Sequence, residues 1–258
     1  MGENANIEPI LQVAGLTKHF GGLTAVDHVD MEVYPGEVVG LLGDNGAGKS
    51  TLIKMISGVY HPDDGQIFFE GKELKLGSPV NALELGIETL YQDLALAENL
   101  NVPANIFLGR EAKKPFLGII PVLDNDSMHE EAKKVLQRLE IEIPSLRSKI
   151  MTLSGGQRQA VAISRSIYWN AKLLIMDEPT AALGVAEQKK VLNLVRTLSS
   201  QNIPVIIISH QLYDIFAVCD RLVIMRRGQK VAERITKQTT PDEVVGLIIG
   251  SDLAERLE

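Results

Sequence analysis

A glycine-rich segment at residues 43–50 restricts the fold of this chain more than any other stretch of the sequence. It follows the pattern Gly-x-x-x-x-Gly-Lys-Ser. Residues 38–42, just before it, form an apolar run of the kind that is buried on both faces of a parallel sheet, and residues 51–57 after it have helical character. A glycine-rich turn between a buried strand and a helix binds phosphate groups through its backbone N–H groups. This arrangement predicts an α/β fold with a mostly parallel core sheet.

The residue types of this phosphate loop suggest how it would hold a nucleotide. Glycines let the N–H groups turn inward, and the following helix adds its dipole. We expect Lys49 to bridge the β- and γ-phosphates, Ser50 to bind Mg²⁺ and Thr51 to contact the α-phosphate. A glycine-rich turn that holds no ligand is the alternative, which the flanking strand and helix disfavour. The nucleotide-binding residues predicted in this loop are Gly43, Asn45, Gly46, Gly48, Lys49, Ser50 and Thr51.

Asp177 and Glu178 follow the apolar residues 173–176, so both carboxylates are expected at the carboxyl end of a buried strand. Ligands of open α/β sheets bind at this edge. We predict that Asp177 binds Mg²⁺ and that Glu178 polarises the attacking water. A solvated acidic loop is the alternative for this pair taken alone, and the phosphate loop elsewhere in the chain favours the catalytic role.

Gln92 and His210 each come at the end of another predicted strand, at residues 87–91 and 205–209. Gln92 could touch Mg²⁺ or the attacking water and so sense the γ-phosphate. His210 could hydrogen-bond the γ-phosphate and steady the water near Glu178. Each has an alternative that the residues alone leave open: Gln92 as an ordinary polar loop residue, and His210 as a structural hydrogen-bonding group.

Residues 154–157, Ser-Gly-Gly-Gln, lead into a predicted helix over residues 157–168. A serine at the N-cap followed by glycines leaves backbone N–H groups open to an anion, and the helix dipole favours negative charge there. The sequence thus holds a second candidate anion site, with Ser154, Gly156 and Gln157 as its predicted nucleotide contacts. A capped turn without a ligand is the alternative.

The chain is predicted to be one domain over residues 1–258, and the composition and hydrophobic pattern change in its middle part. Residues 1–92 and 166–258 alternate short β segments with helices, among them a short helix candidate at residues 79–85, and are predicted to form the core and an N-terminal β subdomain. Residues 93–165 contain several prolines and a strongly helical stretch over 128–139, and are predicted to be an inserted helical subdomain. We find no internal repeat and therefore expect a single nucleotide-binding unit.

Composition limits the partners that this chain is expected to bind. The net charge of −7 argues against a broad electrostatic contact with nucleic acid, which needs clustered Lys and Arg. The only cysteine, Cys219, cannot form an intrachain disulfide, which suits a reducing cytoplasm. The longest apolar runs fall far short of the ~20 residues of a membrane helix, so any contact with a membrane is expected to go through a partner.

The ordered set of phosphate loop, residues 154–157, acidic pair and His210 resembles the ATP-binding cassette (ABC) ATPases over essentially the whole chain. The resemblance implies a P-loop NTPase fold with a mostly parallel core sheet, an N-terminal antiparallel β subdomain and an inserted helical subdomain. It implies ATP and Mg²⁺ as ligands, and an aromatic residue, here Phe20, that stacks on adenine for about 1–3 kcal/mol. It also implies that residues 154–157 close on the ATP held by a second subunit, in a homodimer or a paired cassette.

Three further stretches, residues 91–96, 105–111 and 180–185, are similar to ATPases of bacterial monosaccharide importers of the ribose, xylose and fructose type. This implies ATP hydrolysis that powers uptake through integral membrane permease subunits, which the helical subdomain contacts at the cytoplasmic face of the membrane. A periplasmic or extracellular sugar-binding protein would act indirectly. Gly184 stands where the family usually has an aspartate, and we assign no catalytic role to that loop. The alternative is a soluble ABC ATPase of cofactor (iron–sulfur) assembly.

Overall fold

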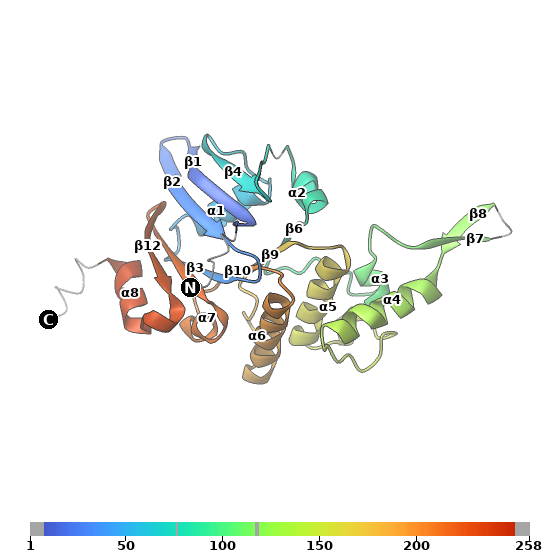
Figure 1. The fold of residues 1–258 in the computed structure, drawn as a ribbon. Helices are drawn as coiled ribbons and strands as arrows, with labels where there is room; N and C mark the ends of the chain where they lie inside the picture. The colour runs from blue at the N-terminus through green and yellow to red at the C-terminus, as the bar shows by residue number, and fades with distance from the viewer. Residues whose placement is uncertain (1–7, 76, 117–118, 251–258) are drawn as a thin grey trace, which may run out of the picture.

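A six-stranded sheet forms the centre of the computed structural model, which describes residues 8–75, 77–116 and 119–250 (Figure 1). Its strand order is β12-β11-β3-β10-β9-β6, and every neighbouring pair is parallel except β11 with the edge strand β12. The parallel strands are β3 (Val38–Leu42), β6 (Ile87–Leu90), β9 (Leu173–Asp177), β10 (Val205–Ile208) and β11 (Arg221–Arg226), and the edge strand is β12 (Gln229–Ile235). The mostly parallel core sheet predicted from the sequence is therefore confirmed.

A second, antiparallel sheet packs on one face of this core. It has the order β2-β1-β4-β5, with β1 (Leu11–Phe20), β2 (Leu23–Val33), β4 (Asp64–Phe69) and β5 (Lys72–Glu73). Helix α1 (Lys49–Ile56) contributes four buried apolar residues to the core cluster that joins the two sheets. This confirms the predicted N-terminal antiparallel sheet and explains why the helix after the phosphate loop is apolar.

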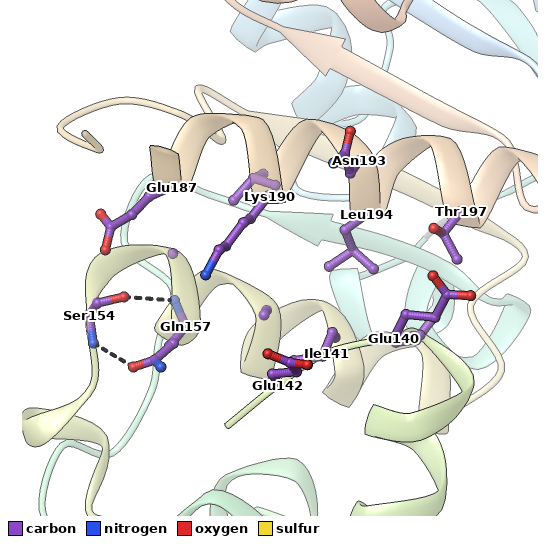
Figure 2. A pocket seen from close by; sticks show the side chains of 14 residues that line it. Glu140, Ile141, Glu142, Ser154, Gln157, Glu187, Lys190, Asn193, Leu194 and Thr197 are labelled. Atoms are coloured by element: carbon purple, nitrogen blue, oxygen red, sulfur yellow. Dashed lines mark hydrogen bonds between the residues drawn. The ribbon is translucent and has the colours of Figure 1, made fainter. Parts of the chain in front are cut away.

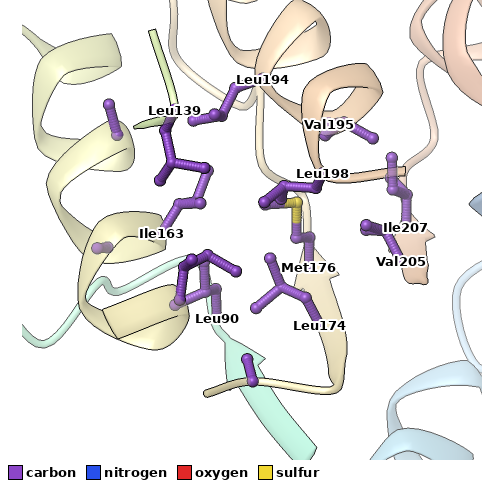
Figure 3. Packing of buried hydrophobic residues seen from close by; sticks show 14 of the residues in the cluster. Leu90, Leu139, Ile163, Leu174, Met176, Leu194, Val195, Leu198, Val205 and Ile207 are labelled. Atoms are coloured by element: carbon purple, nitrogen blue, oxygen red, sulfur yellow. The ribbon is translucent and has the colours of Figure 1, made fainter. Parts of the chain in front are cut away.

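Helices cover the opposite face of the core sheet (Figure 3). They are α5 (Gly155–Tyr168), α6 (Val185–Ser200), α7 (Leu212–Val218) and α8 (Pro241–Ile249). Leu174 and Met176 of β9 face this layer, whereas Leu173 and Ile175 of the same strand face α1 and the antiparallel sheet. Because both faces are buried, the strands are continuous apolar runs rather than alternating ones.

Residues 93–154 contain the elements that project from one end of the sheet (Figure 1). Helix α4 (Asn125–Arg138) matches the predicted helix at 128–139, and the Asp124 side chain caps it by accepting from Ser127 N at 3.3 Å. Helix α3 (Val102–Ile106) and the short η1 (Ile150–Thr152) flank it. Helices α3, α4 and α5 contact one another, and α5 runs across the predicted boundary at residue 165. The division into subdomains remains a prediction.

A β-hairpin of β7 (Lys113–Phe116) and β8 (Ile120–Leu123) inside this region was not predicted from the sequence. Its two prolines, Pro115 and Pro121, lie opposite each other in the register. Proline is tolerated in such a two-stranded ribbon because both strands are edges whose outer N–H groups need no partner. Helices α3 and α7 were also missed, while α2 (Pro79–Leu85) lies at its predicted position.

Within the described part of the chain, no helix combines the length and the apolar composition needed to cross a membrane.

Candidate functional site

The groups predicted to act on a nucleotide lie at the carboxyl ends of four adjacent strands. In the order of the sheet, the phosphate loop follows β3, His210 follows β10, the acidic pair spans the end of β9, and Gln92 follows β6. The register aligns the strand ends, since Ile208 pairs with both Leu41 and Asp177. Among these four neighbouring strands only β9 and β10 are consecutive strands of the chain, so the topology is needed to bring the four groups to one edge.

Two glycines determine the conformation of the phosphate loop. Gly43 and Gly48 have φ angles of 151° and 100°, in the region that side chains disfavour. A Cβ atom on Gly43 would collide with the Met225 carbonyl oxygen, and one on Gly48 would collide with the Ala25 carbonyl oxygen. The loop is thus held between the antiparallel sheet and the β11–β12 turn, and its shape requires glycine at both positions.

The Lys49 ammonium folds back over the phosphate loop. It donates to the carbonyl oxygens of Gly43 at 2.7 Å and Asp44 at 3.0 Å. Burial lowers the pKa of Lys49, while the nearby charges of Glu178, Asp44 and Asp177 oppose this shift. The cation therefore lies between the loop and the acidic pair, where it can exchange its carbonyl partners for phosphate oxygens.

Glu178 combines a strained backbone with an unsatisfied carboxylate. Its φ angle is +53°, in the left-handed region that is uncommon for a residue other than glycine. Its Oε1 atom lies 2.8 Å from His210 Nδ1, while among the described residues its buried Oε2 atom finds no hydrogen-bond partner. The Glu178 side chain is 19% exposed and that of His210 is 74% exposed, so the pair combines a largely buried carboxylate with an accessible imidazole.

The Asp177 carboxyl lies beside this pair. Burial raises its pKa, the charge of Glu178 raises it further, and Lys49 and Lys54 act in the opposite direction. A carboxylate that is destabilised by burial and by a like charge is suited to a cation. The predicted Mg²⁺ ligands Ser50, Gln92 and Asp177 all supply oxygen atoms, which this hard cation prefers. The donor set and the unpartnered Glu178 oxygen thus fit a Mg²⁺–nucleotide.

A buried pair that was not predicted links the loops of Glu178 and His210. The Thr180 hydroxyl donates to a carboxylate oxygen of Asp214, and both residues are almost completely buried. Thr180 lies just after Glu178, and Asp214 lies in α7, just after His210. A polar residue at each of these positions, close behind a predicted catalytic group, was the only sign available in the sequence.

Ser154 and Gln157 form a capping box at the start of α5 (Figure 2). Ser154 N donates to Gln157 Oε1 at 3.0 Å, and Gln157 N donates to Ser154 Oγ at 3.3 Å. The glycines between them pack against the loop before α6 and its first turn, because a Cβ on Gly155 would meet Leu183 and one on Gly156 would meet Glu187. We call residues 154–157 the signature loop. It borders a cleft of about 290 Å³ between α5 and α6, which is lined in part by Glu187 and Lys190.

Phe20 lies at the end of β1 with 43% of its surface exposed. Its ring meets the ring of Tyr60 edge-on, with centroids 5.3 Å apart and planes at 70°. The Lys18 ammonium lies 5.7 Å from the Phe20 centroid. An exposed ring that is steadied on one side leaves a face available for stacking on a base.

Comparisons with known proteins agree with this geometry. A family model described as ABC transporter matches residues 26–181. The xylose/arabinose import ATP-binding protein of Sulfolobus acidocaldarius is 47% identical over 91% of this chain and 92% of its own length. The fructose import ATP-binding protein of Rhizobium meliloti is 43% identical over 95% of each. The chain belongs to the ABC transporter family, and its predicted resemblance to ATPases of sugar importers is confirmed.

Two further relatives extend this result. The ribose import ATP-binding protein of Clostridium tetani is 41% identical over 98% of this chain, which spans 50% of that relative's length. Among solved structures, a nucleotide-free ATP-binding cassette from an ABC transporter has a TM-score of 0.79 at 29% identity, covering 96% of this chain and 98% of its own. The predicted P-loop NTPase fold is therefore confirmed. Since ATP-binding proteins of this family hydrolyse ATP to power transport, the chain is a transport ATPase.

Proposed function

We propose that the chain is the ATP-hydrolysing subunit of an importer that takes up a monosaccharide through separate membrane permease subunits. The observation that supports hydrolysis most directly is the buried Glu178 oxygen that has no partner among the described residues, beside His210 and at the same sheet edge as the phosphate loop. The relatives named for xylose/arabinose and fructose import, which match over more than nine-tenths of this chain, support a sugar as the cargo.

The phosphate loop binds the triphosphate of ATP in this proposal. Its backbone N–H groups surround the phosphates, and Lys49 exchanges the carbonyl oxygens of Gly43 and Asp44 for β- and γ-phosphate oxygens. Thr51 contacts the α-phosphate, and Phe20 stacks on adenine. Asn45, Gly46 and the other loop residues supply N–H groups; the full set is Gly43, Asn45, Gly46, Gly48, Lys49, Ser50 and Thr51.

Glu178 acts as the general base in this site. Its free oxygen accepts a hydrogen bond from the attacking water and orients it, while His210 holds the other oxygen in place. Gln92 faces the same reaction centre from the neighbouring strand and senses the γ-phosphate. Ser50, Gln92 and Asp177 hold Mg²⁺, which supplies charge neutralisation for the phosphate oxygens when it is bound.

A second copy completes each nucleotide site. The N-terminus of α5 has an exposed Ser154 and backbone N–H groups that favour an anion. Ser154, Gly156 and Gln157 of one copy contact the ATP held by the other, so that ATP joins two cassettes and hydrolysis releases them. The partner is a second copy of this chain or a paired cassette.

Residues 93–165 form the part that contacts the permease at the cytoplasmic face of the membrane, and residues 1–92 and 166–258 form the nucleotide-binding core with the β subdomain. A periplasmic or extracellular sugar-binding protein takes part indirectly, by delivering the sugar to the permease. The relatives favour this function over the alternative of a soluble ATPase in iron–sulfur assembly, because those cited are named for sugar import.

The test is an affinity purification of the tagged full chain from detergent-solubilised native membranes, followed by identification of the co-purified proteins. We expect a multi-helix permease, and we expect the ATPase activity of the purified complex in lipid nanodiscs to rise when a monosaccharide and its binding protein are added. The Glu178→Gln variant, purified in the same way, should keep the permease and lose the activity. Recovery of soluble partners alone, with the chain absent from membranes, would contradict the proposal.

A further inference from the structure

Arg165 on α5 holds the loop that follows Gln92. Its guanidinium donates to the carbonyl oxygens of Ala95 at 3.0 Å and Leu94 at 3.3 Å. The loop bends sharply at this point, since Ala95 has a φ angle of +47° and its N–H donates to the Asp93 side chain at 3.2 Å. A single side chain from a distant helix therefore binds the backbone just beyond the predicted γ-phosphate sensor.

The guanidinium also lies near the strand that leads into Gln92. Burial lowers the pKa of Arg165, and the charge of Glu88 on β6 opposes this shift. Burial likewise raises the pKa of Glu88, and the charges of Arg165 and Arg110 oppose that. Arg165 is thus placed between the strand before Gln92 and the loop after it, so the position of Gln92 depends on the position of α5.

The rest of this loop is fixed by a buried asparagine. The Asn105 side chain is completely buried; its oxygen accepts from Ala97 N at 2.7 Å, and its nitrogen donates to Ala97 O and Asn101 O, both at 3.0 Å. The residues after Ala97 therefore cannot move independently of α3.

The same loop pairs with the residues that enter the signature loop. Met151 N donates to Glu98 O at 3.0 Å, and Ile150 N donates to Leu100 O at 3.0 Å. Residues 150–151 come just before Ser154 in the chain. The segment after Gln92 is thus bound at one point by α5 itself and at another by the residues that lead into α5.

From these contacts we infer that Arg165 is a positioning residue that couples Gln92 to the signature loop. Ser154 caps the start of helix α5, and Arg165 near the other end of the helix holds the loop that follows Gln92. A shift of Gln92 toward the nucleotide of its own subunit moves α5, and with it the Ser154 that meets the nucleotide of the second copy. This inference rests on the proposed function, because it assumes the proposed roles of Gln92 and Ser154.

The chemistry of arginine suits this role. A guanidinium is planar and can donate to two acceptors at once in a fixed geometry, whereas the lysine ammonium is a compact charge without that fork. The Arg165→Lys variant keeps a cation near Glu88 but lacks the planar fork that holds both carbonyl oxygens in a fixed geometry, so it weakens the coupling without leaving a buried carboxylate uncompensated.

The test is a double-mutant cycle on the full chain with Arg165→Lys and Gln92→Ala, made separately and together. Each single substitution should lower kcat for ATP hydrolysis by about tenfold, because a small misplacement of a group at the reaction centre is costly. The KM for ATP should stay within about twofold, and the double variant should be no slower than the slower single variant. The control is Arg196→Lys, because Arg196 on α6 also donates to a backbone carbonyl, that of Ala217, at 3.0 Å.

Two outcomes would overturn the inference about Arg165 and leave the proposed function standing. One is an unchanged kcat in Arg165→Lys, and the other is a double variant whose fold-loss of kcat is the product of the two single fold-losses. Thermal unfolding of every variant separates these from a fold defect, and Arg165→Ala should deepen the loss of kcat beyond that of Arg165→Lys. A wild-type chain that neither binds nor hydrolyses ATP would instead refute the proposed function, and with it the roles of both residues.

Discussion

The phosphate loop and the signature loop are both glycine-rich and both lead into a helix, yet glycine serves a different purpose in each. In the phosphate loop, Gly43 and Gly48 have left-handed φ angles and approach backbone carbonyls that a Cβ atom would strike. In the signature loop, Gly155 and Gly156 lie within the helix and make room for the side chains of Leu183 and Glu187. The first pair shapes a turn, and the second pair permits close packing.

The two helix starts also differ in how their N–H groups are satisfied. Gly48, the N-cap of α1, has no side chain to cap the helix, so the first N–H groups of α1 remain available to a ligand. At the start of α5, Ser154 and Gln157 satisfy two N–H groups of their own loop. We therefore expect the phosphate loop to act as a complete anion site and the signature loop to contribute only part of one.

Among the variants that test this comparison, Glu178→Gln should have the largest effect, because it separates ATP binding from ATP hydrolysis. Removing the general base should lower kcat by about 10²–10⁴-fold while ATP binding is retained. An ATP-bound dimer should then accumulate and can be measured by size-exclusion chromatography. The control is Glu130→Gln at an exposed position of α4. Normal turnover in Glu178→Gln would show that Glu178 is not the general base.

Ser154→Arg tests the signature loop as a partial site. The variant should bind ATP as a monomer with unchanged affinity, because the phosphate loop is intact. In the Glu178→Gln background it should no longer form the ATP-dependent dimer, since a long side chain fills the position meant for the second copy's nucleotide. Ser127→Arg on α4 is the matched control. A dimer that persists in Ser154→Arg would contradict the model of two shared sites.

Lys49→Ala tests the phosphate loop as a complete site. Loss of a charged hydrogen-bond donor costs about 1.5–3 kcal/mol, so monomer affinity for ATP should fall by about ten- to a hundredfold. Calorimetric titration of the purified chain measures this directly, with the exposed Lys133→Ala on α4 as its control. Unchanged affinity would mean that Lys49 makes no contact with the bound phosphates.

A second substitution can distinguish the two kinds of glycine, because it should restore stability lost in the signature loop but not in the phosphate loop. Gly48→Ala should destabilise the chain by about 1–3 kcal/mol through backbone strain, and more through the collision with the Ala25 carbonyl. Gly155→Ala meets only a side chain, so Leu183→Ala should restore much of its lost stability. Chemical denaturation of the single and double variants measures both effects. Failure of Leu183→Ala to rescue Gly155→Ala would contradict the packing explanation.

Asp177→Asn should have the smallest effect, which is a change in the thermal stability of the nucleotide-free chain. Burial raises the pKa of Asp177 in the folded chain, so the folded state disfavours the charged form. Stability from this group is present below the unfolded pKa of about 4 and is lost as pH rises through the folded pKa. At pH 7 the neutral amide should therefore raise Tm by about 1–3 °C, and the gain should vanish below about pH 4. An equal gain at both pH values would refute this cause.

Particular elements show what could be predicted from the sequence. Strand β10 and helix α2 lie at their predicted positions, because one is a buried apolar run and the other has a proline at its start and a glycine after its end. The hairpin β7–β8 was missed because proline disfavours strands in general, although the register places Pro115 and Pro121 opposite each other on free edges. Helices α3 and α7, of 5 and 7 residues, were too short to show a helical period.

The candidate site also has a part that the sequence predicts and a part that it does not. Each predicted residue at the sheet edge follows its own strand, which the sequence indicates one strand at a time. The contact of Glu178 with His210, the Thr180–Asp214 pair and the hold of Arg165 on residues 94–95 join segments far apart in the chain. No pattern along the sequence predicts such contacts, because they depend on which strands become neighbours.

The sequence by itself determined the phosphate loop, the capped start of α5 and the strand ends that hold the acidic pair. These depend on local properties: which residues tolerate a left-handed φ angle, which side chains reach a nearby N–H group, and where an apolar run stops. Only the tertiary structure decided that β3, β10, β9 and β6 lie side by side and that α5 reaches back to the Gln92 loop. Burial of both sheet faces requires segments from distant parts of the chain to pack together, and burial is a property of the whole chain.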